Sequence, residues 1–278
     1  MTSPASGQVS KSDYQFLCSF LREQMGYELG EGKEYLVDGR LAPVAATFGL
    51  NDVSSLLHQL RITKDQILRT AIIDAMAINE TYFFRAPQVF DTLRSKILPA
   101  LFVARCNSRC LRIWCAGCST GQEMYSIAMM LNDHFPELCG WSIQLVGTDI
   151  SDQSLNRARQ GRYNQFEVQR GLPVQFLIKY FKKESGTWQI SDDLRRRVLF
   201  QKHNLLDSFA DLRGTFDIIL VRNVLIYFDT AKKSTVFAKV RQLIAADGYL
   251  LLGESETVFG LTEQFKPCKN LEGFYAPS

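Results

Sequence analysis

Residues 111–123, with the sequence LRIWCAGCSTGQE, hold residue types that could bind a nucleotide-like ligand. An apolar run ends in the small residues 115–121, and a helical pattern starts at Gln122, which predicts a strand, a tight turn and a helix. Small residues let the backbone approach a ligand, and the free N–H groups at the start of a helix point toward it. The alternative is an ordinary turn of an α/β protein.

Two acidic residues narrow the class of ligand. The turn has only Gly117 and Gly121, so it lacks the G-x-G-x-x-G pattern of pyrophosphate binders, and it is followed by Glu123. Asp149 ends the next predicted strand, where one carboxylate can accept hydrogen bonds from two ribose hydroxyls. Acids suit a ligand with positive charge and hydroxyl donors, such as S-adenosylmethionine.

Composition and charge exclude several other classes of protein. The 278 residues carry a formal net charge of +3, which is too small to indicate a nucleic-acid partner. No apolar run reaches the length of a membrane-spanning helix, and the polar N-terminus lacks the apolar core of a signal peptide. We therefore expect a cytoplasmic monomer that does not insert into the membrane.

The cysteines raise the question of a metal site. Seven cysteines, an odd number, indicate reduced thiols in a cytosolic protein. Cys106, Cys110, Cys115 and Cys118 could bind zinc, but the last two would lie at a buried strand end and in the ligand turn. A shared tetrahedral site would distort that turn, so we expect no metal.

The first part of the chain is predicted to be helical. We expect disorder in residues 1–11 and a small all-α domain in residues 12–76. Helices are predicted after Asp13, at residues 34–46, after Asp52 and over residues 63–76. Its basic residues form either a solvated face or a surface for a protein partner; they are Lys33, Arg40, Arg61, Lys64 and Arg69.

Residues 77–90 are predicted to link this domain to the next. Three consecutive aromatic residues and Arg85 do not suit a surface helix, whereas Asn79 and Thr81 offer hydrogen bonds. Either the aromatic side chains only fill the two adjoining cores, or the segment also contacts the ligand. A helix is predicted from Pro87 toward Val103.

Residues 91–278 predict a doubly wound α/β domain. The continuously apolar residues 216–221 are typical of a strand that helices cover on both faces. Strands are also expected at residues 198–200 and 249–252, the latter after a helix over residues 230–246 that Asp247 and Gly248 close. Residues 161–197 interrupt this alternation with a helix and a strand-turn-strand, which predicts an inserted antiparallel β subdomain. Residues 265–275 predict a terminal antiparallel pair.

Six motifs together resemble the chemotaxis receptor methyltransferase family, CheR. They are NETYFFR (79–85), AGCSTGQE (116–123), TDIS (148–151), HNLLD (203–207), FDIILVRNVLIYF (216–228) and GESE (253–256). The resemblance covers nearly the whole chain, and NETYFFR and RNVLIYF are its specific parts. It implies a Rossmann-like class I methyltransferase that uses S-adenosylmethionine to methylate glutamate side chains on the signalling helices of chemoreceptors, for sensory adaptation.

The resemblance also implies which residues form the site. It puts around the cofactor Asn79, Thr81, Arg85, Glu123, Asp149, Asn204, Leu205, Arg222 and Asn223, to which the glycine turn adds Gly117. It puts Arg85 and Tyr227 nearest the transferred methyl group, as the catalytic residues. Some members dock a C-terminal receptor pentapeptide on the inserted subdomain. The turn at residues 183–186 looks shorter here, which counts against such tethering.

The chemistry of such a transfer requires no general base. A glutamate side chain has a pKa of about 4.3 and is ionised at pH 7. Two other classes of function stay open. The first is a methyltransferase for nucleic acid or a small molecule, although residues 222–225 lack the prolines common in base N-methylating enzymes. The second is a catalytically silent module that binds the cofactor.

Overall fold

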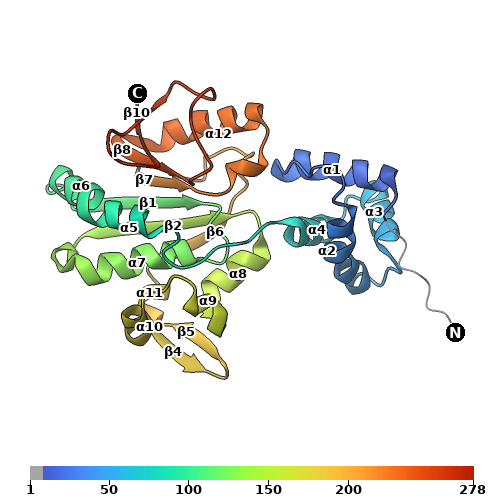
Figure 1. Ribbon diagram of the computed structural model, residues 1–278, viewed down its shortest axis with the longest axis horizontal. Coiled ribbons are helices and arrows are strands. Elements are labelled where there is room, and N and C mark those ends of the chain that lie inside the picture. The colour runs from blue at the N-terminus through green and yellow to red at the C-terminus, as the bar shows by residue number, and fades with distance from the viewer. Residues whose placement is uncertain (1–8) are drawn as a thin grey trace.

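The computed structural model describes residues 9–278, and its first four helices form a separate unit at one end of the molecule (Figure 1). These helices are α1 (Lys11–Met25), α2 (Glu34–Thr47), α3 (Val53–Ile62) and α4 (Gln66–Met76). Asp52 and Asp65 cap α3 and α4, as expected for acids that accept backbone N–H groups at a helix start. Leu17, Leu56 and Ile72 are fully buried, so the unit has a core of its own.

The start of α1 differs from the sequence-based expectation. The predicted disorder of residues 1–11 lies, for residues 1–8, outside the described residues. Val9 is buried and Ser10 caps the helix by accepting the N–H of Asp13, so α1 begins at Lys11 and not after Asp13. Ser10 and Asp13 share this cap, and the sequence alone did not show which of the neighbouring polar residues would take the first position.

The basic residues of the helical unit are partly used inside it. Arg61 pairs with Asp13 at 3.0 Å and lies over the ring of Phe16. Arg40 donates to the carbonyl of Met76, and Arg69 lies over a second phenylalanine ring. These arginines therefore hold the four helices together, whatever else they bind.

A seven-stranded sheet forms the centre of the second unit. Its order is β6 (Val198–Lys202), β2 (Ser142–Asp149), β1 (Cys110–Ala116), β7 (Phe216–Val221), β8 (Ile244–Leu252), β10 (Phe274–Pro277) and β9 (Phe265–Pro267). The first five strands are parallel, and β10 runs antiparallel to both of its neighbours. The strand order reverses at β1 and β7, which places a crevice at their carboxyl ends.

Alternate residues of β1 enter two different cores. Ile113 and Cys115 pack under α7 (Gln122–His134), while Trp114 and Ala116 pack under α12 (Thr230–Leu243). This alternation follows from the two-residue period of a strand. The predicted doubly wound sheet is confirmed: α7 and α8 (Asp152–Gln160) cover one face and α12 the other (Figure 1).

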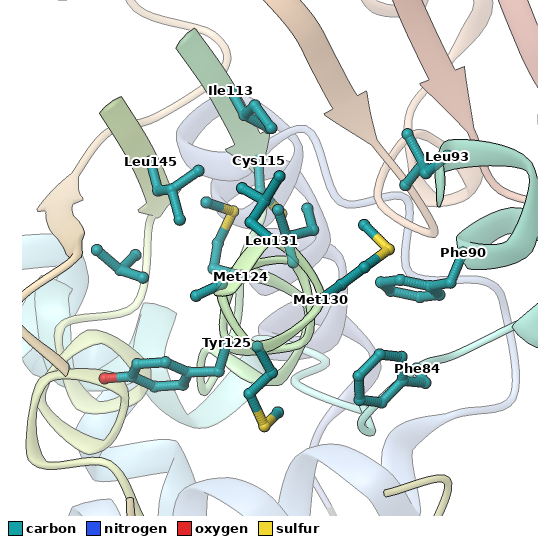
Figure 2. Close-up of a cluster of buried hydrophobic side chains, with 14 of the residues drawn as sticks. Phe84, Phe90, Leu93, Ile113, Cys115, Met124, Tyr125, Met130, Leu131 and Leu145 are labelled. Atoms are coloured by element: carbon teal, nitrogen blue, oxygen red, sulfur yellow. The ribbon is translucent and has the colours of Figure 1, made fainter. Parts of the chain in front are cut away.

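Helix α7 is surrounded by apolar side chains. Residues 122–131 are all buried, including the acid Glu123. Figure 2 looks along this helix and shows Ile113 and Leu145 of the sheet on one side and Phe84 and Phe90 on another. A helix that is buried all round keeps its first turn fixed, and that turn borders the crevice.

The helix after Pro87 contains a π-helical turn. The segment consists of α5 (Pro87–Thr92), the π turn η1 (Leu93–Ile97) and α6 (Leu98–Ala104). Leu98 donates its N–H to Leu93, five residues back, immediately before Pro99. Proline lacks an N–H and its ring crowds the preceding turn of an α-helix, so the wider turn accommodates Pro99 without breaking the helix.

The insertion between α8 and β6 is a small mixed subdomain. It holds a three-stranded antiparallel sheet in the order β3 (Arg162–Tyr163), β5 (Thr187–Ile190) and β4 (Phe181–Glu184). The predicted hairpin is confirmed, and its two-residue turn has Ser185 and Gly186 in the left-handed region. The sequence missed the short elements β3, α9 (Gln165–Gln169) and α11 (Asp192–Arg195); α10 (Val174–Tyr180) was expected.

The predicted end of the last helix was wrong. α12 ends at Leu243, and Asp247 and Gly248 lie inside β8 instead of closing the helix. Ile244 already pairs with Phe216 of β7, and the register then shifts before regular pairing resumes. Arg105 at the end of α6 binds Asp247 through both carboxylate oxygens, at 2.8 and 2.6 Å, which holds this irregular segment against the sheet.

Two short 3-10 helices, η2 (Pro136–Leu138) and η3 (Leu225–Tyr227), complete the fold. Within residues 9–278, no helix has the length and apolar character that crossing a membrane requires.

Candidate active site

One pocket lies at the carboxyl ends of the parallel strands. Its walls come from the end of α1, from residues 77–85, from the β1–α7 turn and from the ends of β2, β6 and β7. The structure brings together every residue for which a site role was expected; these are Asn79, Thr81, Arg85, Gly117, Glu123, Asp149, Asn204, Leu205, Arg222, Asn223 and Tyr227.

The β1–α7 turn is held by the end of β2. Gly117 and Cys118 both donate their N–H groups to the carbonyl of Thr148, at 2.7 and 2.9 Å. Asp149 accepts the N–H of Ser119 at 2.8 Å and that of Ser151 at 2.9 Å. Burial raises the pKa of the Asp149 carboxyl, against the opposing effect of these two hydrogen bonds.

Gly117 shows why the turn needs small residues. Its φ is +75°, and a Cβ at this position would lie 2.3 Å from a methyl carbon of Val224. A larger residue would therefore push away the loop after β7, which forms the opposite wall of the pocket.

Glu123 forms a buried ion pair with Arg222. Arg222 is 7% exposed and Glu123 is 8% exposed, so both charges lie out of water and compensate each other. Arg222 also donates to the carbonyl of Arg85 at 3.0 Å. Its Nε is buried and has no hydrogen-bond partner among the described residues, which leaves one donor beside the pocket for an acceptor from outside the chain.

Two buried cysteines lie beside this pair. The thiol of Cys115 donates to Glu123 at 3.3 Å, and Cys118 lines the pocket. Burial raises the pKa of both thiols well above the usual range, so they stay protonated. All seven cysteines are free thiols. In the part of the chain that the structure covers, no group of three or more histidine, cysteine or acidic side chains could hold a metal ion.

The segment that carries Arg85 is bent and held from several sides. Phe84 and Ala86, on either side of Arg85, have left-handed φ angles of 50° and 61°. Ser126 of α7 accepts the N–H of Phe84 at 3.0 Å, and the ring of Phe83 contacts the insertion at Tyr163. Phe83 and Phe84 thus fill the core of the second unit only, and not both adjoining cores, while other residues of the same segment line the pocket.

The insertion also contacts this segment through Arg170 and Gly171. Arg170 pairs with Glu80 at 2.8 Å and lies over the ring of Tyr82. Gly171 packs so closely that a Cβ there would lie 2.0 Å from the carbonyl oxygen of Phe83.

Arg85 and Tyr227 offer a cation and a phenol to the same pocket. The guanidinium of Arg85 donates to the carbonyl of Glu80 at 3.2 Å and lies over the ring of Tyr82. Burial raises the pKa of Tyr227, with a further rise from Tyr27 and an opposing effect from Arg85. The phenol therefore stays protonated near neutral pH and can donate a hydrogen bond.

The end of α1 closes one side of the pocket, which the sequence did not reveal. Tyr27 packs edge-on against Tyr227 with the ring centroids 5.5 Å apart, and Glu28 donates its N–H to the carbonyl of Tyr227 at 2.9 Å. Asn204 donates to the carbonyl of Gln24 at 2.7 Å. The only sequence signal was the glycine that ends α1, which marked a turn but not a contact 200 residues away.

The polar groups of the pocket are those that S-adenosylmethionine would require. The pocket combines a carboxylate at the end of β2, three side-chain amides and the buried Nε donor of Arg222. Carboxylates and amides match ribose hydroxyls and an ammonium, while the buried donor matches a carboxylate. The sheet order and this pocket define a class I methyltransferase that uses S-adenosylmethionine.

Comparison with known proteins identifies the family. Residues 79–274 match the family model of the CheR methyltransferase S-adenosylmethionine-binding domain, and residues 12–77 match that of the CheR all-alpha domain. The chain therefore belongs to the CheR methyltransferase family.

Curated relatives match almost the full length. A chemotaxis protein methyltransferase of Vibrio parahaemolyticus is 39% identical over 261 residues, which are 93% of this chain and 94% of the relative. Chemotaxis protein methyltransferase 1 of Vibrio cholerae is 38% identical over 261 residues, with the same two coverages. Chemotaxis protein methyltransferase 1 of Pseudomonas aeruginosa is 36% identical over 262 residues, again 93% and 94%.

Proposed function

We propose that this methyltransferase esterifies glutamate side chains on the cytoplasmic signalling helices of chemoreceptors, and that this reaction serves sensory adaptation. The names of the relatives support the chemotaxis setting. The observation that carries the proposal is that the guanidinium of Arg85 and the protonated phenol of Tyr227 line one pocket with the polar groups that suit the cofactor.

The cofactor would be held by both walls of the pocket. Asp149 has spare acceptor capacity for two ribose hydroxyls, because each of its oxygens accepts only one backbone N–H. The unpartnered Nε of Arg222 would take the carboxylate of the amino-acid end. The remaining contacts would come from Asn79, Thr81, Arg85, Gly117, Glu123, Asn204, Leu205 and Asn223. When bound, S-adenosylmethionine supplies an electrophilic methyl group on a sulfonium.

The chain's own task would be to align a carboxylate and remove water from it. The guanidinium of Arg85 would hold the glutamate carboxylate at one oxygen, leaving the other to react. Tyr227 would donate a hydrogen bond that fixes the direction of approach. Alignment and proximity can supply up to about 7–11 kcal/mol of the barrier reduction. No proton acceptor is required, because a glutamate side chain with a pKa of about 4.3 is already ionised at pH 7.

The two rival functions make different predictions. A base-methylating or small-molecule enzyme would form an N-methyl or another stable product, and a silent module would bind the cofactor without any transfer. A glutamyl methyl ester differs from both because mild base releases methanol from it.

The test is a transfer assay with methyl-labelled cofactor and purified signalling fragments of chemoreceptors. We expect label on the fragment and volatile methanol after mild base. A fragment whose methylatable glutamates are replaced by alanine is the matched control. Base-stable label, or none on any fragment while S-adenosylhomocysteine still binds, would refute the proposal.

A further inference from the structure

The loop after β7 carries several of the residues that line the pocket. Arg222 and Asn223 follow β7 directly, and Tyr227 ends the short helix η3. Asn223 has a left-handed φ of 60°, which is unusual for a residue other than glycine. A loop with this conformation needs an external support to keep it in place.

Glu256 supplies that support from outside the pocket. Its Oε2 accepts the N–H of Asn223 at 2.7 Å and that of Gly253 at 2.8 Å. Its Oε1 accepts the N–H groups of Val224 at 3.0 Å and Leu225 at 2.7 Å. One carboxylate thus binds four backbone donors and ties the loop after β7 to the turn after β8.

Two further features of the turn show how closely the parts fit. A Cβ on Gly253 would lie 2.7 Å from Oε2 of Glu256 and 3.0 Å from the N atom of Asn223, so a side chain there would displace the carboxylate. Val224, held by the same carboxylate, packs its side chain against Gly117 of the β1–α7 turn. The carboxylate therefore fixes the loop relative to both neighbouring strand ends.

We infer that Glu256 is a positioning residue for methyl transfer, which acts by holding the loop that carries Asn223 and Tyr227. Glu256 does not line the pocket, so its effect reaches the reaction through this loop. The inference rests on the proposed function for its activity readout, while the anchoring of the loop can be measured without it.

Glu254, in the same turn, provides a matched control. It is an exposed acid two residues away that accepts only a hydrogen bond from Gln88 at 3.2 Å. Glu256→Gln keeps one carboxamide oxygen, which can serve two of the four donors, whereas Glu256→Ala serves none. The two substitutions at Glu256 therefore remove the four hydrogen bonds in part and completely. Glu254→Gln changes the charge of the turn and leaves these hydrogen bonds intact.

The first measurement is single-turnover methyl transfer to a receptor fragment at saturating cofactor. We expect a loss of about tenfold in Glu256→Gln, a larger loss in Glu256→Ala and a change within about twofold in Glu254→Gln. Thermal unfolding verifies that each variant is folded. Hydrogen exchange at residues 223–225 is expected to speed up in Glu256→Gln, while the amides of β1 keep their protection.

The second measurement separates positioning from a general structural role. If Glu256 acts through Tyr227, then Tyr227→Phe will cost a smaller factor in the Glu256→Gln background than in the wild type. Unchanged transfer in Glu256→Gln, unchanged exchange at residues 223–225 or independent costs in the double variant would each overturn the inference. A wild-type chain that transfers no methyl group would overturn the proposed function instead, and the exchange data would still decide whether Glu256 anchors the loop.

Discussion

Arg85 illustrates how a single side chain is prepared for chemistry by its neighbours. The left-handed residues on both sides of it each cost on the order of 1 kcal/mol, and the aromatic core beneath them compensates for that cost. Its guanidinium keeps two anchors, the carbonyl of Glu80 and the ring of Tyr82, and retains further donors for a substrate.

Replacing Arg85 should separate turnover from cofactor affinity. We expect Arg85→Ala to lower the single-turnover rate about 100-fold, because the carboxylate loses the cation that aligns it. Calorimetry should show S-adenosylhomocysteine affinity within about threefold of wild type, since other residues carry most of that binding. Arg94→Ala, at an exposed ion pair, is the control. Equal losses of rate and affinity would assign Arg85 to cofactor binding alone.

Replacing Asp149 should weaken cofactor affinity more than the rate of transfer, and it should also change how stability depends on pH. Burial raises the folded-state pKa of Asp149 above the unfolded value of about 3.9. Its contribution to stability therefore falls as the pH rises from the unfolded pKa to the folded pKa. Asp149→Asn removes this penalty but also removes one of the two oxygens that accept backbone N–H groups. In urea unfolding the variant should therefore lose less stability relative to wild type at pH 7 than at about pH 4. It should also bind S-adenosylhomocysteine at least tenfold more weakly, because a charged acceptor for the ribose is lost.

The control for Asp149 is Asp152→Asn, which removes an exposed acid paired with Lys202 at the surface. We expect its affinity to stay close to wild type. An unchanged dissociation constant in Asp149→Asn would refute the ribose role.

The sequence predicted the pocket residues better than the contacts among them. Motif resemblance named ten residues that line one pocket, because residue type and order are what a motif preserves, and the glycine turn added Gly117. It did not reveal that Glu123 is already paired with Arg222, nor that Glu256 binds four backbone donors. The ion pair and three of the four bonds to Glu256 join segments more than 30 residues apart, and no local pattern encodes them.

At the scale of elements, the partly buried ion pairs of Arg105 hold α6 against the irregular part of β8. Its Nε donates to Asp217 at 2.8 Å, and its two other nitrogens bind Asp247. Asp217 is buried and also accepts the N–H of Arg112 at 2.7 Å. The sequence predicted a helix over residues 230–246 closed by Asp247 and Gly248, because Asp-Gly is a common helix end. This tertiary ion pair and the buried Ile244 extend the strand instead.

Removing Arg105 should destabilise the fold strongly. We expect Arg105→Ala to lower the free energy of unfolding by about 3 kcal/mol, because Asp217 keeps a buried charge without its cation. Urea unfolding measures this loss. Arg241→Ala, which leaves the network untouched, should change stability by less than about 0.5 kcal/mol. A similarly small loss in Arg105→Ala would show that the pair contributes little.

Asp247 should make the stability contributed by the same ion pairs depend on pH. Its bonds to Arg105 lower its folded-state pKa, so its contribution is present above the unfolded pKa and is lost as pH falls through the folded value. Because more than half of its side chain is exposed, Asp247→Asn should cost less than about 1 kcal/mol at pH 7. The difference from wild type should shrink as the pH falls below the unfolded pKa of about 3.9, and a difference that stays constant there would contradict the ion-pair account.

Considered as a whole molecule, the protein builds its pocket from both units. The helical unit supplies Met25 and Tyr27, and hydrogen bonds from Glu28 and Asn204 join the two units at the pocket rim. Hydrophobic period and turn residues were enough to predict the helical unit, the doubly wound sheet and the insertion. They could not predict how the units meet, because the contacts there include isolated backbone hydrogen bonds and a tyrosine pair that no periodic pattern encodes.

Ligand binding should therefore stabilise both units. At 100 times its dissociation constant, S-adenosylhomocysteine should raise the free energy of unfolding by about 2.7 kcal/mol. Hydrogen exchange should slow at residues 24–28 of the helical unit as well as at residues 222–225. Protection limited to the second group would show that the end of α1 takes no part in binding.

The thiols have a practical consequence for anyone who wishes to follow this protein by fluorescence. The two cysteines at the cofactor turn, Cys115 and Cys118, are buried, and burial keeps them protonated. Cys106 and Cys139 are exposed and lie just before β1 and β2, at the end of the sheet opposite the pocket. A maleimide dye should therefore attach at the outer pair first and leave the donor pocket intact, so that a labelled preparation still reports native behaviour.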